Sequence, residues 1–335
     1  MNHLPRPGRR RYAIENRFRY WPSDREPDVT TRKSRHVSIP VGVLLTLVAL
    51  VLAGCGSRSS PRPAGSAGHV GVVAGENFWG DIAKQIGGSR VTVTSVITDP
   101  NADPHLYESD AGTAAAVNSA QLVIVNGLGY DDFMGKVLAT SPNPARKVLT
   151  AAAVMQISGS DANPHIWYDI AKVPQVSSAI AAQLGALDPV DAPAFVANAK
   201  TFNDSLASLN AAITNIKIKY AGAPVGYTER VPGYLLDAAG LKLATPSSFA
   251  QAIEDGNEPS PADNAAMDSA VRSKAIKVLL YNAQVTSPAT EAVKALAQRS
   301  GVPLVGVTET LPATGANFQA WQLRQVNELA SALGK

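Results

Sequence analysis

The chain of 335 residues carries 30 Lys and Arg against 27 Asp and Glu, a formal net charge of +3. The basic excess lies in residues 1–55, which hold ten Lys and Arg and four Asp and Glu, so the remainder has 20 basic and 23 acidic residues. This weakly acidic remainder contains no basic stripe, which argues against nucleic acid as a partner. Its length is sufficient for one large domain or for two lobes.

The single cysteine, Cys55, follows an apolar run over residues 38–54 that is preceded by a short basic stretch. The run has the length of a secretory signal and is short of the ~20 residues that span a membrane. Leu52–Cys55 resembles the bacterial lipobox, in which the cysteine is acylated. The alternative is an uncleaved anchor with an accidental cysteine, and both interpretations place the rest of the chain outside the membrane. We predict a leader and signal peptide over residues 1–54 and a lipid on Cys55.

The next residues, 55–68, are small, polar or rich in Pro and Gly, so we expect a flexible tether and a folded body from about His69. Residues 1–28 are longer than a signal peptide requires. Two hypotheses account for them: translation begins at Met1, or it begins downstream, for example at Val29.

Short β-branched runs alternate with Ala-rich helical patterns between residues 69 and 170, which predicts an α/β lobe with a parallel sheet. Residues 121–126 form a continuous apolar run, typical of a strand that is covered on both faces. The strands that we expect in this lobe cover residues 69–74, 91–97, 121–126 and 147–151.

A helical segment follows over residues 171–221. Apolar side chains recur every three or four residues from Val190 to Tyr220, which predicts one long helix of ~30 residues and ~45 Å. Residues 222–335 return to alternating strands and helices and predict a second α/β lobe, with strands over 224–228, 276–281 and 303–308. Residues 246–264 form the longest irregular stretch, which we expect to be either a loop over or beside the cleft or simply solvated surface.

The predicted architecture is therefore two Rossmann-like parallel-sheet lobes joined by one long, rigid helix. Open α/β sheets bind ligands at the carboxyl ends of their strands, so we expect the site in the cleft between the lobes.

Two histidines lie inside the body, and both occur in matching tripeptides, Asp-Pro-His105 and Asn-Pro-His165. Proline fixes its own φ and restricts the residue before it, which stiffens the approach to each imidazole. A single loop histidine is more often plain surface, but two in matching positions indicate metal ligation. No cysteine or further histidine remains in the body, so the other ligands must be oxygen.

Two glutamates occupy corresponding positions in the second lobe. Glu229 follows the strand over residues 224–228, and Glu309 follows the strand over 303–308. Both could equally be surface acids, and Glu229 could pair with Arg230. Tyr107, Trp167 and Asn282 are candidates for groups that support the ligands.

These motifs resemble those of the metal-binding lipoproteins of ABC importers, the cluster A-I (TroA-like) family that serves Zn²⁺ or Mn²⁺. The resemblance covers residues 69–333 and the lipobox. It implies a third ligand at Glu229, where zinc receptors typically carry His and manganese receptors Glu. It implies a fourth ligand at Glu309, where the family usually carries Asp, so this position departs from the pattern.

The resemblance implies an extracytoplasmic receptor, not an enzyme, that delivers Zn²⁺ or Mn²⁺ to an ABC permease and its ATPase. We expect a monomer that a lipid on Cys55 anchors to the outer face of the cell membrane. Two carboxylates and two imidazoles suit either ion, so both stay open. The alternatives are a surface metal-dependent hydrolase and an adhesin-type lipoprotein.

Overall fold

The computed structural model describes residues 69–99, 107–312 and 316–335. The predictions for the signal peptide, the lipid on Cys55, the tether and His105 fall outside these residues. Contacts divide the chain into Met1–Ser60 and Pro61–Lys335, and the fold concerns the second unit. Within the described residues, no helix has both the length and the apolar character to cross a membrane.

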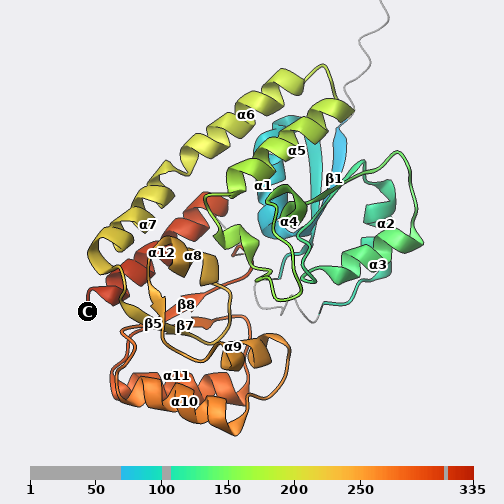
Figure 1. Ribbon diagram of the computed structural model, residues 1–335. Coiled ribbons are helices and arrows are strands. Elements are labelled where there is room, and N and C mark those ends of the chain that lie inside the picture. The colour runs from blue at the N-terminus through green and yellow to red at the C-terminus, as the bar shows by residue number, and fades with distance from the viewer. Residues whose placement is uncertain (1–68, 100–106, 313–315) are drawn as a thin grey trace, which may run out of the picture. The chain divides into compact units, whose positions relative to one another are not determined.

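Two four-stranded parallel sheets form the framework, as predicted (Figure 1). The first sheet has the order β2-β1-β3-β4, and the second has the equivalent order β6-β5-β7-β8. The first consists of β1 (Val70–Glu76), β2 (Val91–Ile97), β3 (Leu122–Val125) and β4 (Lys147–Thr150). The second consists of β5 (Pro224–Tyr227), β6 (Lys242–Leu243), β7 (Leu279–Asn282) and β8 (Leu304–Val307). Because β5, β7 and β8 are parallel neighbours in the second sheet, their carboxyl ends lie side by side.

Helices cover both faces of the first sheet. Successive side chains along each strand point to opposite faces, so each strand contributes to two cores. Val72 and Ile124 face the core that includes α1, whereas Val73 and Val123 face the core that includes α3. All four residues of β3 are buried, which confirms the expectation for this apolar run. The helices of this lobe are α1 (Asn77–Gly87), α2 (Ala111–Ser119), α3 (Asp132–Thr140) and α4 (Ala151–Val154).

The second sheet is also covered on both faces. Leu280 and Val305 join the large core that includes α7 and α12, and Leu279 joins a smaller core with Phe249 and Val293. The helices of this lobe are α8 (Gly233–Ala238), α9 (Ser247–Glu254), α10 (Pro261–Arg272), α11 (Pro288–Ser300) and α12 (Phe318–Leu333). The large core contains residues of both sheets, so the two lobes share it.

The expected long helix is two helices, α6 (Ala192–Ser205) and α7 (Ala207–Tyr220), which follow one another beside α5 (Val173–Leu187) and α12 (Figure 1). The prediction of one uninterrupted helix is wrong at Leu206. There the amide of Leu206 donates to the carbonyl of Asn203, three residues back, and the Ser205 hydroxyl donates to the carbonyl of Phe202. A hydroxyl that competes for backbone groups tightens the turn and interrupts the ladder.

The expected loop over residues 246–264 is also wrong, because α9 and the first turn of α10 lie within it. Phe249 and Ile253 are four residues apart and are buried in the smaller core, which stabilises α9 as a helix. Ser260 caps α10 by accepting from the amide of Asp263.

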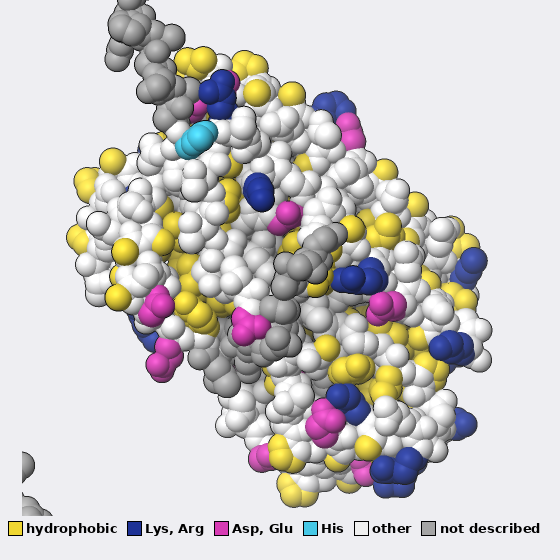
Figure 2. Space-filling model, turned by 180° about the vertical axis from the view of Figure 1, so that it is seen from behind, with side chains coloured by type: hydrophobic (Ala, Val, Ile, Leu, Met, Phe, Trp, Pro, Cys, Tyr) yellow, Lys and Arg dark blue, Asp and Glu magenta, His cyan; other side chains and the backbone are white. Residues whose placement is uncertain are grey.

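On the face that Figure 2 shows, Lys and Arg side chains are interspersed with Asp and Glu and do not gather into a stripe.

Candidate metal site

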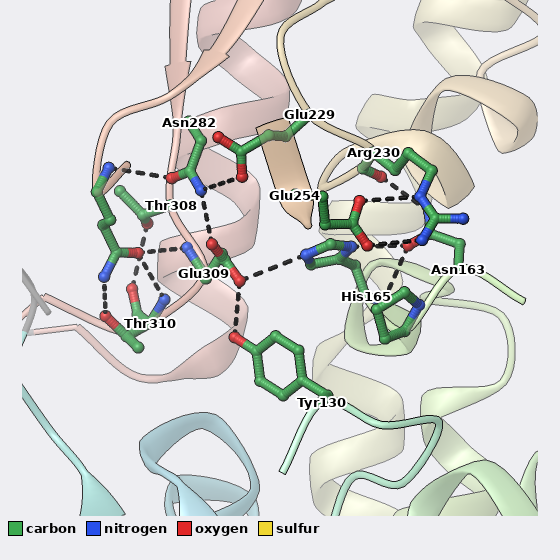
Figure 3. Close-up of polar contacts among 12 residues, drawn as sticks. Tyr130, Asn163, His165, Glu229, Arg230, Glu254, Asn282, Thr308, Glu309 and Thr310 are labelled. Carbon is green, nitrogen blue, oxygen red and sulfur yellow. Dashed lines mark hydrogen bonds and ion pairs between the residues drawn. The ribbon is translucent and has the colours of Figure 1, made fainter. Parts of the chain in front are cut away.

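The second sheet places Glu229 and Glu309 at the same edge. Glu229 lies two residues beyond β5, and Glu309 lies two residues beyond β8. Strand β7 lies between β5 and β8, and its last residue, Asn282, is in register with Val307. Asn282 therefore stands between the two glutamates. Its Nδ2 donates to Oε2 of Glu229 at 2.9 Å and to Oε1 of Glu309 at 2.6 Å (Figure 3).

His165 belongs to the first lobe, at the start of the short 3-10 helix η3 (Ile166–Tyr168). Its Nε2 lies 3.3 Å from Oε2 of Glu309, and both side chains are fully buried (Figure 3). The predicted meeting of a histidine from one lobe with a carboxylate from the other is therefore observed for this pair. Two ligands of one tetrahedral ion, each at ~2.0–2.1 Å, stand ~3.3 Å apart, so the separation is compatible with a shared ion.

Asn163 decides which nitrogen of His165 faces Glu309. Its Nδ2 donates to the carbonyl of Arg230 at 2.8 Å, which fixes the orientation of the amide. Its Oδ1 therefore accepts, and it lies 2.7 Å from Nδ1 of His165. Nδ1 carries the proton in this network, so a neutral His165 presents the lone pair of Nε2 to Glu309.

When His165 is neutral, the contact between Nε2 and Glu309 brings two acceptors together. The Tyr130 hydroxyl donates a hydrogen bond to the same Oε2 of Glu309 at 2.8 Å. Two facing lone pairs repel each other unless a proton or a cation is shared between them. The arrangement is chemically suited to a divalent cation.

Gln284 holds the loop that carries Glu309. Its Oε1 accepts from the backbone amides of Glu309 and Thr310, and its Nε2 donates to Oγ1 of Thr310 at 2.8 Å. The backbone amide of Gln284 donates to Oδ1 of Asn282 at 3.0 Å. One turn after β7 thus positions both Asn282 and the loop after β8.

The three supporting candidates have different roles. Asn282 binds both glutamates, and the ring of Trp167 packs edge-on against that of His165 with centroids 5.3 Å apart. Tyr107 instead contacts Thr113 through its hydroxyl at 3.2 Å. Tyr130, Asn163 and Gln284 were not predicted to serve the site. Asn163 was noted only for its place before Pro164, and no spacing signal in the sequence marked Tyr130 or Gln284.

Arg230 pairs with Glu254, in a bidentate contact with N···O distances of 2.7 and 2.8 Å. The alternative that Glu229 is an ordinary partner of Arg230 is thereby weakened. A cavity of about 390 Å³ opens beside Glu229, and Glu254, Asp255 and Glu258 also line it.

The described residues do not by themselves complete the predicted ligand set. Among residues 69–99, 107–312 and 316–335, no group of three or more His, Cys, Asp or Glu side chains is arranged to hold a metal ion. His165 meets Glu309 directly, and Glu229 is joined to Glu309 through Asn282. His105 lies outside the described residues. The four-residue set stays a prediction.

Comparison with known proteins places this geometry in a family. The sequence model of the family "Zinc-uptake complex component A periplasmic" matches residues 72–332. The chain belongs to this family. Its membership confirms the resemblance that the two histidine motifs indicated.

Relatives of this zinc-uptake family member include the manganese-binding lipoprotein MntA of Bacillus subtilis (strain 168). It is 31% identical over 165 residues, which are 48% of this chain and 53% of that protein. The chain thus matches about half the length of this relative. The manganese ABC transporter substrate-binding lipoprotein PsaA of Streptococcus mitis is 23% identical over 278 residues, which are 78% of this chain and 86% of that protein.

The fold agrees with that of the periplasmic zinc-binding protein TroA from Treponema pallidum, with a TM-score of 0.68 and 20% identity. The likeness covers 79% of this chain and 99% of that protein. It confirms the predicted two-lobed α/β fold.

A pair of buried carboxyl groups lies in the first lobe of this family member. Asp131 accepts from the backbone amides of Asn126 at 2.6 Å and Gly127 at 2.9 Å. Glu76, the last residue of β1, is fully buried, and its pKa is raised well above 4.5, first by burial and then by the charge of Asp131. Glu76 therefore keeps its proton in the folded protein at pH values where the unfolded chain has lost it.

Glu76→Gln is expected to flatten the pH dependence of the free energy of unfolding. Below pH 4.5 the glutamate is protonated in both states, whereas above it the unfolded state ionises and the folded state does not. Stability of the natural protein should then fall with rising pH, by at most about 1.4 kcal/mol per pH unit, until Glu76 ionises in the folded state. Glutamine does not ionise, so the free energy of unfolding of Glu76→Gln should not show this fall with rising pH.

Urea unfolding between pH 4 and pH 8 measures the effect, with the exposed Glu328→Gln as the matched control. If plots of the free energy of unfolding against pH were parallel for the natural protein and Glu76→Gln, the expectation would be contradicted.

Proposed function

We propose that this protein is an extracytoplasmic receptor that captures a divalent transition metal ion, Zn²⁺ or Mn²⁺, and passes it to an ABC permease with its ATPase. The observation that carries the proposal is the buried contact between Nε2 of His165 and Oε2 of Glu309 at 3.3 Å. When His165 is neutral, two acceptors from different lobes face each other in this contact, and a shared cation removes their repulsion.

The proposed ligands are His105, His165, Glu229 and Glu309. Two imidazoles and two carboxylates form an acceptable tetrahedral zinc site, and their hard and borderline donors also suit Mn²⁺. The names of the family and of its members support both ions, since the family is named for zinc uptake and the two relatives above are named for manganese.

Donors from two separate lobes favour capture and release over catalysis. An ion held by both lobes would favour one arrangement of the lobes over another. A permease could then distinguish the loaded receptor from the empty one by its surface. We propose that the protein is not an enzyme, that it acts as a monomer, and that a lipid on Cys55 holds it at the outer face of the membrane.

The test is metal content and affinity. Elemental analysis of the purified protein, followed by competition between Zn²⁺ and Mn²⁺, is expected to give one tightly bound ion per chain. Glu229→Ala should lower the affinity by at least tenfold, because it removes one of four donors. Unchanged stoichiometry and affinity in Glu229→Ala would remove the second lobe from the proposed ligand set. Absence of any bound ion in the natural protein would refute the receptor itself.

A further inference from the structure

The loop that joins β3 to α3, residues 126–131, has an unusual backbone. Gly127, Leu128 and Gly129 all have positive φ angles, of 85°, 59° and 81°. A residue with a side chain is strained at such an angle, and the strain persists only where surrounding contacts hold it. At Gly127 a Cβ would also lie 2.8 Å from Cγ2 of Thr150, so only glycine fits there. The contacts of this loop therefore indicate what the strained conformation serves.

Buried side chains at both ends of the loop hold it in place. At its end, the carboxylate of Asp131 accepts from the backbone amides of Asn126 at 2.6 Å and Gly127 at 2.9 Å. At its start, Oδ1 of the fully buried Asn126 accepts from Nε1 of Trp79 at 3.2 Å. These contacts close the loop on itself and fix its backbone independently of any ion.

The same loop reaches both members of the buried histidine–carboxylate pair. Nδ2 of Asn126 donates to the carbonyl of Pro164 at 2.9 Å, directly before His165 in the chain. The hydroxyl of Tyr130, a residue that is 3% exposed, donates to Oε2 of Glu309 at 2.8 Å. This is the oxygen that faces Nε2 of His165 at 3.3 Å (Figure 3). One fixed loop of the first lobe therefore contacts the histidine segment and the carboxylate of the second lobe.

We infer that this loop sets the separation of the two proposed ligands and that Tyr130 is a positioning residue of the metal site: its hydroxyl holds Oε2 of Glu309 at a distance from His165 at which both side chains can bind one divalent cation. This inference rests on the proposed function. A carboxylate oxygen has two lone pairs, so a hydrogen bond from Tyr130 is compatible with binding of a cation by the same oxygen. A hydroxyl has no net charge, so, unlike lysine or arginine, it fixes the carboxylate without neutralising it.

Ring packing alone is the alternative role for Tyr130. Its ring meets that of Trp167 edge-on, with centroids 4.9 Å apart, and that of His165 with centroids 5.8 Å apart. Phenylalanine would keep both ring contacts and lose only the hydroxyl. Tyr130→Phe therefore separates positioning of the carboxylate from packing of the ring.

The experiment uses the full chain, with Zn²⁺ and Co²⁺ as probes. Tyr130→Phe is expected to lower the affinity for Zn²⁺ by about 10- to 100-fold, the range typical of partners that orient metal ligands. It should also shift the visible absorption bands of bound Co²⁺, because these bands depend on the arrangement of the ligands around the ion. A loss of fold stability alone would not move them. The matched control is Tyr220→Phe at the end of α7, where the hydroxyl lies beside Gly334, and it should change neither readout.

The inference is overturned, and the proposed function stands, if Tyr130→Phe matches the natural protein in its affinity for Zn²⁺ and in its Co²⁺ spectrum. A loss of affinity without a shift of the Co²⁺ bands, or an equal loss in Tyr220→Phe, overturns it as well. If Tyr130→Phe does not fold, Tyr130→Met, which fills the space without a hydroxyl, gives the same comparison. Failure of the natural protein to bind either ion overturns both proposals.

Discussion

His165→Ala is expected to lower the affinity for Zn²⁺ and Mn²⁺ by more than about a hundredfold. Losing a residue that merely orients a ligand costs ~10- to 100-fold, and His165 is proposed as a ligand itself. Its imidazole is fully buried, its Nδ1 is held by Asn163 at 2.7 Å, and its Nε2 faces Glu309 at 3.3 Å.

Isothermal titration against a chelator of known affinity measures this loss. His69→Ala is the matched control: it removes the same side chain at an exposed position at the start of β1. It should leave the affinity unchanged. A drop of less than tenfold in His165→Ala, or an equal drop in His69→Ala, would contradict the assignment of His165 as a ligand.

Trp167→Ala is expected to lower the free energy of unfolding by about 3–5 kcal/mol, the usual cost of emptying a buried aromatic position. The indole is fully buried. It stacks on the ring of Phe78 with centroids 4.2 Å apart and meets the ring of Tyr130 edge-on at 4.9 Å. Because Trp167 lies two residues after His165, the cavity would also loosen the support of that imidazole.

Trp167→Phe should lower the free energy of unfolding much less than Trp167→Ala, because an aromatic ring still fills the site. Comparing it with Trp79→Phe separates the effect of ring packing from that of a hydrogen bond. Among the residues that the structure describes, Nε1 of Trp167 has no hydrogen-bond acceptor. Nε1 of Trp79, by contrast, donates to Oδ1 of Asn126 at 3.2 Å. Trp79→Phe is therefore expected to cost about 1 kcal/mol more than Trp167→Phe, since it leaves a buried amide oxygen without its donor.

Chemical denaturation of the four proteins checks both expectations. The interpretation would be wrong if Trp167→Phe were as destabilising as Trp167→Ala, or if Trp79→Phe were the milder of the two phenylalanine variants.

Period and composition were sufficient to predict the parallel sheets and seven of the eight strands that the structure describes; β6 (Lys242–Leu243) was missed. The run over residues 121–126 is apolar throughout because β3 is covered on both faces, and such a pattern depends on no distant contact. The break at Leu206 and the helix α9 escaped prediction. The first depends on a hydroxyl that competes for backbone groups, and the second on the burial of Phe249 and Ile253 against other helices.

The candidate site shows the same division. Matching tripeptides marked His165, and positions after strands marked Glu229 and Glu309. The partners of these residues are far apart in sequence: Tyr130 and Glu309 are separated by 179 residues, and Asn282 and Glu229 by 53. No local pattern encodes such pairs, because a hydrogen bond between distant segments depends on how the strands are ordered in the sheet.

Local chemistry along the chain was thus enough to indicate a two-lobed α/β protein and to predict an exported chain with imidazole and carboxylate ligands. Residue type and spacing carry that information, since helix and strand periods and the donor properties of a side chain are local. The order of β5, β7 and β8 placed Asn282 between the two glutamates, and the meeting of the lobes placed Nε2 of His165 against Oε2 of Glu309. These contacts arise only when the sheets assemble, because burial and strand order bring together atoms that the chain keeps far apart.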